Sequence, residues 1–151
     1  MTTSYDADFY TWTQVQAQAL RAKDWQAMDL ENLAEEIESL GKRDRRGVES
    51  YLEVVAKHLL KWVYQPQERA RRGRSWRMSI GKARRGIERL IEDSPSLRDV
   101  PAPRLVSIYR RARHGAADET GLPLTTFPDA CPWSLEQLQD EDFWPGAEDE
   151  R

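Results

Sequence analysis

Three side chains of this sequence could meet to do chemistry: Glu36, His58 and Glu119. His58 is one of two histidines, and at helical spacing it borders the apolar face of a predicted helix. Glu36 borders the apolar face of a second predicted helix, and Glu119 falls on that of a third. Carboxylates and a histidine that project inward from neighbouring helices can bind a metal ion or transfer a proton. The three residues are therefore a candidate metal-dependent, hydrolase-like site.

A structural role explains the same residues more simply. The sequence contains neither Glu-x-x-His nor His-x-x-x-His, the pairs by which helices usually hold metals. A single histidine beside an apolar face is more often a core residue that hydrogen-bonds a carboxylate or a carbonyl. We therefore expect a buried polar network around His58, with no metal and no cofactor. The alternative of a catalytic site stays open.

No other residue pattern points to catalysis. Cys131 lies between Ala130 and Pro132 with no basic residue just before it, so it lacks the setting of an activated thiol. His114 falls opposite the apolar face of its predicted helix, which predicts an exposed side chain. Phosphate-binding glycine loops, paired cysteines and nucleophile elbows are all missing from the sequence. The balance leans away from an enzyme.

A run of arginines is the second candidate site. Residues 42–89 carry 15 basic and 5 acidic side chains, a net charge of +10, within a chain whose total is −3. Arginines interleaved with a tryptophan suit stacking on single-stranded RNA. The alternative function is nucleic-acid binding through the basic segment 69–89. Its candidate residues are Arg69, Arg71, Arg72, Arg74, Trp76 and Arg77.

The flanking segments carry the opposite charge. Residues 1–41 have 8 acidic and 2 basic side chains, and residues 90–151 have 13 acidic and 6 basic ones. Such segregation either pairs within the molecule or offers a surface to a charged partner. The sequence pI of about 5.5 lacks the basic footprint of most nucleic-acid-binding domains. A non-catalytic module that binds another protein is therefore the preferred function.

Periodicity predicts an all-α, single-domain bundle of about five helices. The central helix, residues 48–64, is apolar around most of its circumference and stops before Pro66. In the helix over 30–40 we expect Leu30, Leu33, Ala34, Ile37 and Leu40 to face inward. Gly41 is either the C-cap of that helix or an interior point of one long helix.

Further helices are predicted around these two. A helix over 5–22 is capped by Asp6 or Asp8. Ser75 caps a helix over 76–92 that follows a basic loop or a frayed helical turn. A helix begins near Pro103 and ends at 119–121. An extended, proline-rich segment follows over 122–132. Ser134 and Gln137 form a capping box for a short final helix.

Length and composition indicate the number of domains and the cellular compartment of the protein. The length of 151 residues fits one domain, which we place at 1–146 with a polar tail at 147–151. One cysteine fits a reducing compartment, and the sequence shows neither a signal peptide nor an apolar run of membrane-spanning length. We expect a cytoplasmic protein without membrane contact. Its oligomeric state cannot be predicted from these features.

Ordered motifs along nearly the whole chain resemble one known family. From Tyr5 to Pro145 they are Y-D-A-D-F-Y-T-W, D-L-E-N-L-A-E-E-I-E-S-L-G, H-L-L-K-W-V-Y-Q-P, S-W-R-M-S-I, D-S-P-S-L, E-T-G-L-P, F-P-D-A-C-P-W and D-E-D-F-W-P. In this order and spacing they resemble the bacterial "domain of unknown function 29" family, frequent in cyanobacteria. The resemblance implies an all-α domain. It implies no activity, so it identifies no catalytic residues.

Overall fold

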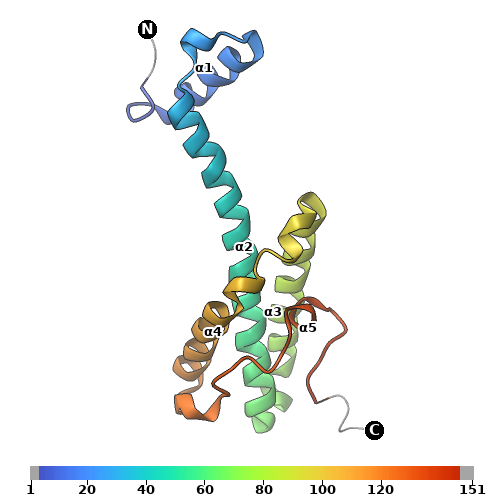
Figure 1. The fold of residues 1–151 in the computed structure, drawn as a ribbon. Helices are drawn as coiled ribbons and strands as arrows, with labels where there is room; N and C mark the ends of the chain where they lie inside the picture. Colours follow the sequence, from blue (N-terminus) through green and yellow to red (C-terminus); the bar gives the residue numbers. More distant parts are fainter. Residues whose placement is uncertain (1–3, 147–151) are drawn as a thin grey trace. The chain divides into compact units, whose positions relative to one another are not determined.

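The protein is helical throughout the part that a computed structural model describes, residues 4–146 (Figure 1). No strand occurs in these residues, which confirms the predicted all-α class. Short 3-10 turns occupy Trp25–Ala27, Pro95–Arg98, Ala102–Arg104 and Leu124–Thr126. The helices are α1 (Phe9–Ala22), α2 (Leu30–Tyr64), α3 (Pro66–Asp93), α4 (Leu105–Thr120) and α5 (Leu135–Gln139).

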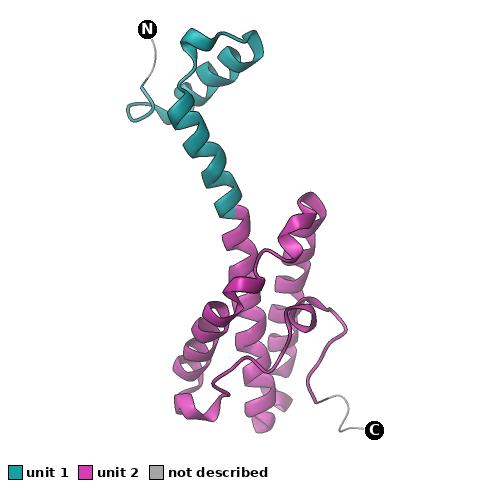
Figure 2. Cartoon of the chain, in the orientation of Figure 1, with its two compact units in different colours: residues 1–43 teal, residues 44–151 magenta. Residues whose placement is uncertain are grey.

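The chain forms two compact units, residues 1–43 and 44–151 (Figure 2). The boundary falls inside α2, so the N-terminal part of this helix is described with unit 1 and the remainder with unit 2. The expected domain limits of 1–146 stay a prediction. The predicted polar tail, 147–151, lies outside the described residues.

Unit 1 is held together by polar side chains around one buried tryptophan. Gln16 donates to the Ala27 carbonyl at 3.1 Å and accepts from the Asp29 backbone N–H at 2.7 Å. The indole N–H of Trp12 donates to the Asp29 carboxylate at 3.2 Å. Asp8 caps α1 by accepting from the Thr11 backbone N–H, as one of the two predicted caps. Because this cap precedes Phe9, the predicted start of the helix at Tyr5 was too early.

The expected inward face of the second helix is wrong. Leu30, Ile37 and Leu40 are 58%, 67% and 59% exposed, and Ala34 is exposed as well. Leu33 alone is half-buried. The apolar arc of this part of α2 is wider than the part of its surface that is buried. Gly41 is not a C-cap but an interior residue of a continuous α2.

Unit 2 has the apolar core that the sequence predicted. The inward face of α2 is buried along Val48, Leu52, Val55 and Leu59. Side chains from α3, α4 and the C-terminal segment complete the same cluster. Burial of a Leu or Ile side chain contributes roughly 1.5–3 kcal/mol, so this cluster dominates the stability of the unit. It also fixes the rotation of α3, and with it the face that α3 turns to solvent.

The segment before Ser75, expected as a basic loop or a frayed helical turn, belongs to α3, which begins at Pro66. The loop is therefore wrong, and Ser75 lies inside the helix and does not cap it. Proline suits the first helical position, where its missing N–H and fixed φ cost nothing. Glu68 then pairs with Arg71 at 3.0 Å and with Arg72 at 3.4 Å, one turn along the helix. The arginines of residues 69–77 are therefore distributed around a helix. Pro66 therefore lies just after the end of α2 and is the first residue of α3.

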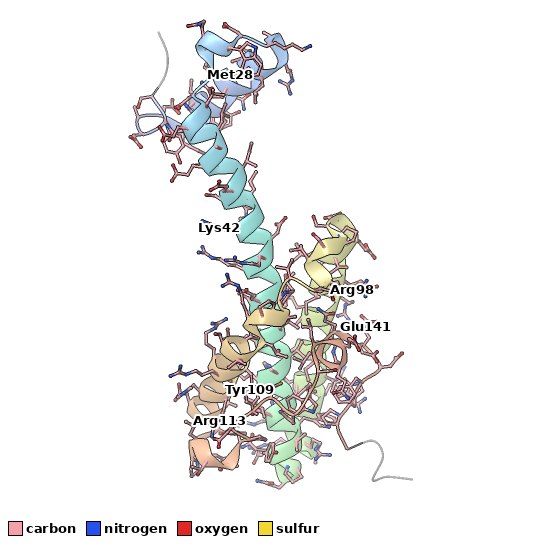
Figure 3. All side chains as sticks on the ribbon, viewed as in Figure 1. Met28, Lys42, Arg98, Tyr109, Arg113 and Glu141 are labelled. Atoms are coloured by element: carbon pink, nitrogen blue, oxygen red, sulfur yellow. The ribbon has the colours of Figure 1, made fainter. Side chains whose placement is uncertain are left out.

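The C-terminal segment lies across unit 2 and is fixed by buried side chains. Tyr109 donates its hydroxyl to the Pro128 carbonyl at 2.5 Å, and Arg113 donates to the carbonyls of Phe127 and Leu124 (Figure 3). Gly121 ends α4 in the left-handed region, with φ 71°. The predicted capping box of Ser134 and Gln137 is present at the start of α5, with both hydrogen bonds formed.

Candidate functional site

Two of the three acid–base candidates lie at the end of unit 2 where α2, α3 and α4 meet. Glu119, in the last turn of α4, accepts hydrogen bonds from Lys57 at 2.9 Å and from Lys61, both on α2. Partial burial alone would raise the pKa of the Glu119 carboxyl. The two lysine hydrogen bonds outweigh burial and lower that pKa to about 2. Glu119 is thus a paired carboxylate, with no proton to donate near neutral pH.

His58 lies between the two lysines on α2, and its ring bonds to the backbone. Its Nδ1 is 2.8 Å from the Val54 carbonyl, and a carbonyl can only accept, so this nitrogen bears the proton. Burial lowers the pKa of the His58 imidazole, and the charges of Lys61 and Lys57 lower it further. The hydrogen bond that Nδ1 donates to the Val54 carbonyl and the burial of the ring favour a neutral imidazole.

Glu36 belongs to unit 1, where its carboxylate accepts a hydrogen bond from the Tyr5 hydroxyl. This bond raises the pKa of the Tyr5 hydroxyl to about 12. Within residues 4–146, no three His, Cys, Asp or Glu side chains gather as a metal site. The structure thus brings His58 and Glu119 into one unit and gives Glu36 a different partner.

A small polar cavity of about 200 Å³ lies beside Glu119. The residues that line it include Lys61 of α2 and Arg71, Arg72 and Trp76 of α3. Thr120 also lines the cavity. Its hydroxyl donates a hydrogen bond to the Ala116 carbonyl at 2.7 Å. The cavity can hold a small polar group, and its lining offers no free nucleophile.

The predicted arginine site separates into an inner and an outer group. Arg69 and Arg77 lie over the ring of Trp62, each 5.2 Å from its centroid, and Arg77 also covers Trp144. These cation–π contacts occupy the faces of both rings. Trp76 is only 5% exposed, so it cannot stack on a base. Of the six predicted nucleic-acid residues, Trp76 is therefore buried, and Arg69 and the exposed Arg77 contact the ring of Trp62.

The outer group forms one long, exposed stripe, which we call the basic face of α3. At 100° per residue its members fall on one side of the helix, and an open groove of about 640 Å³ runs along it from Arg71 to Arg85. Apart from the half-buried Ser79, every member is exposed. The members are Arg71, Arg74, Ser75, Met78, Ser79, Lys82, Arg85 and Arg89.

Only Arg71 and Arg74 of this face are among the six candidate residues named from the sequence. Lys82, Arg85 and Arg89 lay within the broader segment 69–89 but were not singled out. Helical numbering from Pro66 would have aligned them, because Lys82 follows Arg71 by eleven residues, and Arg85 and Arg89 follow Lys82 by three and seven. The sequence carries this spacing, but the expected start of a helix at Ser75 separates Arg71 and Arg74 from the later members.

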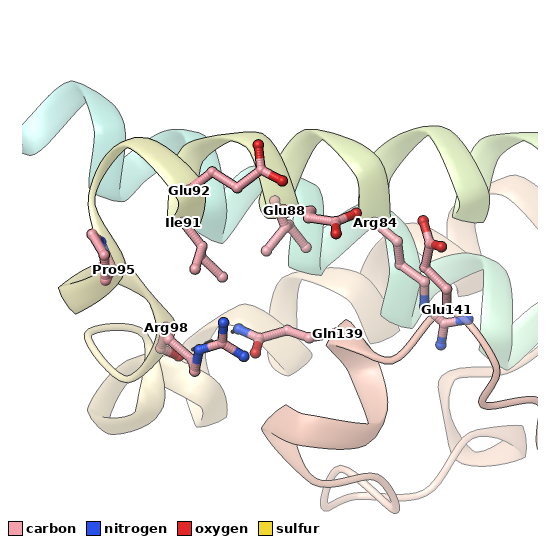
Figure 4. Close-up of a pocket in the computed structure, with 9 residues that line it drawn as sticks. Arg84, Glu88, Ile91, Glu92, Pro95, Arg98, Gln139 and Glu141 are labelled. Carbon is pink, nitrogen blue, oxygen red and sulfur yellow. Dashed lines mark hydrogen bonds between the residues drawn. The ribbon is translucent and has the colours of Figure 1, made fainter.

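A second cavity of about 450 Å³ lies between α3, the turn at Pro95–Arg98 and α5 (Figure 4). Glu88, Glu92 and Arg98 line it with both signs of charge. Arg84, 2% exposed, donates to the carbonyls of Gln137, Leu138 and Phe143. That guanidinium fastens the C-terminal segment to α3 and is not free for a ligand. None of the nine lining residues is a His, Cys, Ser or Thr.

The remaining single residues fit structural roles. Burial raises the pKa of the Cys131 thiol, whose Sγ is 3.2 Å from the Trp133 carbonyl. A thiol of raised pKa is a poor nucleophile. His114 is exposed, as predicted. None of the helices in residues 4–146 combines the length and apolarity that crossing a membrane requires.

Comparison with known proteins gives one result. A family model described as "Domain of unknown function DUF29" matches residues 4–144, nearly the whole chain. The chain belongs to this family. No curated protein and no solved structure matches the chain. The DUF29 description supplies no activity, so any function rests on the geometry above.

Proposed function

We propose that this DUF29 protein is a non-catalytic module that binds an acidic protein partner on the basic face of α3. The observation that supports this most is the set of positively charged side chains on that face that have no carboxylate partner among the described residues. Arg74, Lys82 and Arg85 are exposed, and no described carboxylate pairs with them; Arg71 pairs with Glu68. Like charges along one ridge repel each other, so an acidic surface laid against them relieves repulsion as well as adding attraction.

The basic face is held rigid before any partner arrives. The opposite side of α3 is buried through Ile80, Ala83 and Ile87, which are 0%, 3% and 1% exposed. A preorganised surface loses less backbone entropy on binding than a flexible basic segment does. The helix therefore presents its charges at fixed spacing to the partner.

The chemistry of the face favours protein over single-stranded RNA. Met78, 66% exposed, lies in the middle of the arginines, and methionine and arginine are both enriched in protein interfaces. Binding of single-stranded RNA relies on aromatic platforms for its bases. Trp76 is buried and Trp62 is covered by arginines, so the basic face has no such platform. RNA binding through phosphates alone is the second candidate.

We place this activity in the cytoplasm. Support comes from the single, partly buried Cys131, which has no partner for a disulfide in its own chain. A free thiol suits a reducing compartment.

The test is a charge reversal on the basic face. The variant carries Arg74→Glu, Lys82→Glu and Arg85→Glu. A control variant carries three reversals at exposed basic residues elsewhere, Arg21→Glu and Arg110→Glu with Lys42→Glu, so that both have the same net charge. Fluorescence anisotropy measures binding of a labelled, glutamate-rich peptide with one apolar residue per turn, and of a labelled single-stranded RNA.

The expected result is salt-sensitive binding of the acidic peptide that the basic-face variant loses and the control keeps. Stronger binding of RNA than of peptide, lost in the same variant, would favour the second candidate. Equal peptide binding by the variant and the wild type would refute both. Far-UV circular dichroism checks that each variant keeps its helices.

A further inference from the structure

The small polar cavity of about 200 Å³ beside Glu119 is lined by more positive than negative charge. Lys61, Arg71 and Arg72 line it, together with the carboxylates of Glu68 and Glu119. The side chain of Lys61 is 12% exposed, whereas those of Arg71 and Arg72 are 72% and 60% exposed. Lys61 therefore belongs to the inner wall of the cavity and the two arginines to its rim. Every lining residue belongs to unit 2.

Each of the two carboxylates is held by two cations. Arg71 Nη2 and Arg72 Nε lie 3.0 and 3.4 Å from the same oxygen, Oε2 of Glu68. Glu119 accepts hydrogen bonds from two lysines of α2. Four cations against two carboxylates leave this cluster with an excess charge of +2. The ion pairs thus hold like charges close together, and an anion bound among them would lower their repulsion.

The same cations keep hydrogen-bond donors that have no acceptor within residues 4–146. Arg72 contacts a carboxylate through Nε alone, so both of its Nη groups are available, and Arg71 uses only Nη2. A lysine ammonium has three donors, and Lys61 gives one of them to a carboxylate. Gln65 also lines the cavity and makes no side-chain capping bond at the start of α3, so its amide can donate. Unused donors from two helices therefore surround one small space.

We propose that this cavity binds a phosphate group, either as inorganic phosphate or as the monoester of a small molecule. A phosphate monoester carries a charge of about −1.5 to −2 at pH 7, which matches the excess of the cluster. Its oxygens accept hydrogen bonds from guanidinium forks and from an ammonium group. A carboxylate would neutralise only half of that excess. Pockets for larger ligands occupy about 300–1,000 Å³, so the size of this cavity also indicates a small anion.

This inference does not rest on the binding of an acidic protein by the basic face of α3. The cavity and the basic face share Arg71 and no other residue. The variants below therefore leave Arg71 and the rest of the basic face unchanged. Failure of one proposal leaves the other standing.

The first test is equilibrium dialysis of the full chain against radiolabelled inorganic phosphate, with the ionic strength held constant by chloride. The wild type should bind phosphate saturably. Arg72→Gln removes one charge and a fork of donors from the rim, and it should weaken binding roughly tenfold. Arg110→Gln is the matched control, because Arg110 is exposed on α4 and does not line the cavity. It should bind phosphate as the wild type does.

The second test changes the affinity in the opposite direction. Glu119→Gln removes a negative charge from the wall of the cavity and releases Lys61 from its ion pair. Phosphate should therefore bind more tightly to this variant than to the wild type. A general loss of structure would weaken binding instead, and circular dichroism checks that each variant keeps its helices.

Competition identifies the source of the phosphate group. If glycerol phosphate displaces the label as well as unlabelled phosphate does, the site accepts a monoester. If inorganic phosphate alone displaces it, the ligand is the free anion. Absence of saturable binding by the wild type, or equal binding by Arg72→Gln and the wild type, would overturn the proposal. Unchanged or weaker binding by a folded Glu119→Gln variant would overturn the role given to Lys61.

Discussion

Gly86 of α3 is the position where one methyl group should have the largest effect. A Cβ built on Gly86 would lie 2.5 Å from Cζ and 2.6 Å from Cε2 of Tyr51, on α2. Carbon atoms in contact prefer about 3.5–4.0 Å, so the ring would have to move by about 1 Å. Tyr51 packs against the core of unit 2, which limits that movement.

The expected cost of Gly86→Ala can be worked from two opposing terms. Alanine favours a helix over glycine by about 0.8–1.0 kcal/mol. Overpacking of a filled site costs typically about 1–3 kcal/mol. Gly81→Ala, five residues earlier in α3, is the matched control. Its Cβ would meet only the flexible end of Arg85, at 3.1 Å from Nη1.

Urea unfolding of the two variants isolates the close contact. The helix-propensity gain is common to both and cancels when they are compared. Gly81→Ala should therefore raise the free energy of unfolding, and Gly86→Ala should lie roughly 1–3 kcal/mol below it. The two substitutions share chemistry, helix and unit, so the difference reports the contact with Tyr51.

A double-mutant cycle completes this test. Tyr51→Leu removes the ring, so in that background Gly86→Ala should regain the stabilisation seen for Gly81→Ala. The reasoning is refuted if Gly86→Ala stabilises the protein as much as Gly81→Ala does. It is also refuted if Tyr51→Leu leaves the effect of Gly86→Ala unchanged.

Three further predictions concern polar residues of unit 2. Arg84→Met should cost roughly 2–4 kcal/mol, because the carbonyls that it binds lose a charged donor, whereas Arg85→Met should stay within about 0.5 kcal/mol; urea unfolding compares them. The Glu119 carboxyl has a pKa lowered from 4.5 to about 2, so its stabilising effect is complete above pH 4.5 and is lost as the pH falls toward 2. Thermal unfolding of wild type and Glu119→Gln should therefore converge in acid, and a constant gap would contradict the ion pair. Burial lowers the pKa of His58, so stability should fall as the pH drops below 6.5, and His58→Gln should flatten that slope in thermal unfolding; an unchanged slope would show that His58 is not the group responsible.

Local features of the fold could be predicted because their causes are local. The capping box of Ser134 and Gln137 and the C-cap at Gly121 each depend on a few neighbouring residues. The buried face of the central helix followed from a period of 3.6 residues, and Val48, Leu52 and Leu59 are fully buried. Family membership was also visible in ordered motifs and is confirmed over residues 4–144.

The candidate site was predicted only in part. Whether one face of a helix is buried or exposed depends on the elements that pack against it, and the sequence pattern does not give these. The apolar residues Leu30, Ile37 and Leu40 were expected to be buried, yet all three are more than half exposed. The arginine segment was recognised as basic. Which of its arginines contact a tryptophan, and which remain on the exposed face, depends on where Trp62 and Trp144 lie.

The sequence by itself determined an all-α protein of one known family, with its core face and several of its helix ends, because periodicity and capping act between near neighbours. Tertiary structure alone decided which arginines stack on Trp62 and which remain on the exposed face of α3. It likewise decided that Glu119 pairs with Lys57 and Lys61 and that Gly86 meets Tyr51. These contacts join residues that are far apart in the chain, so no local sequence pattern predicts them.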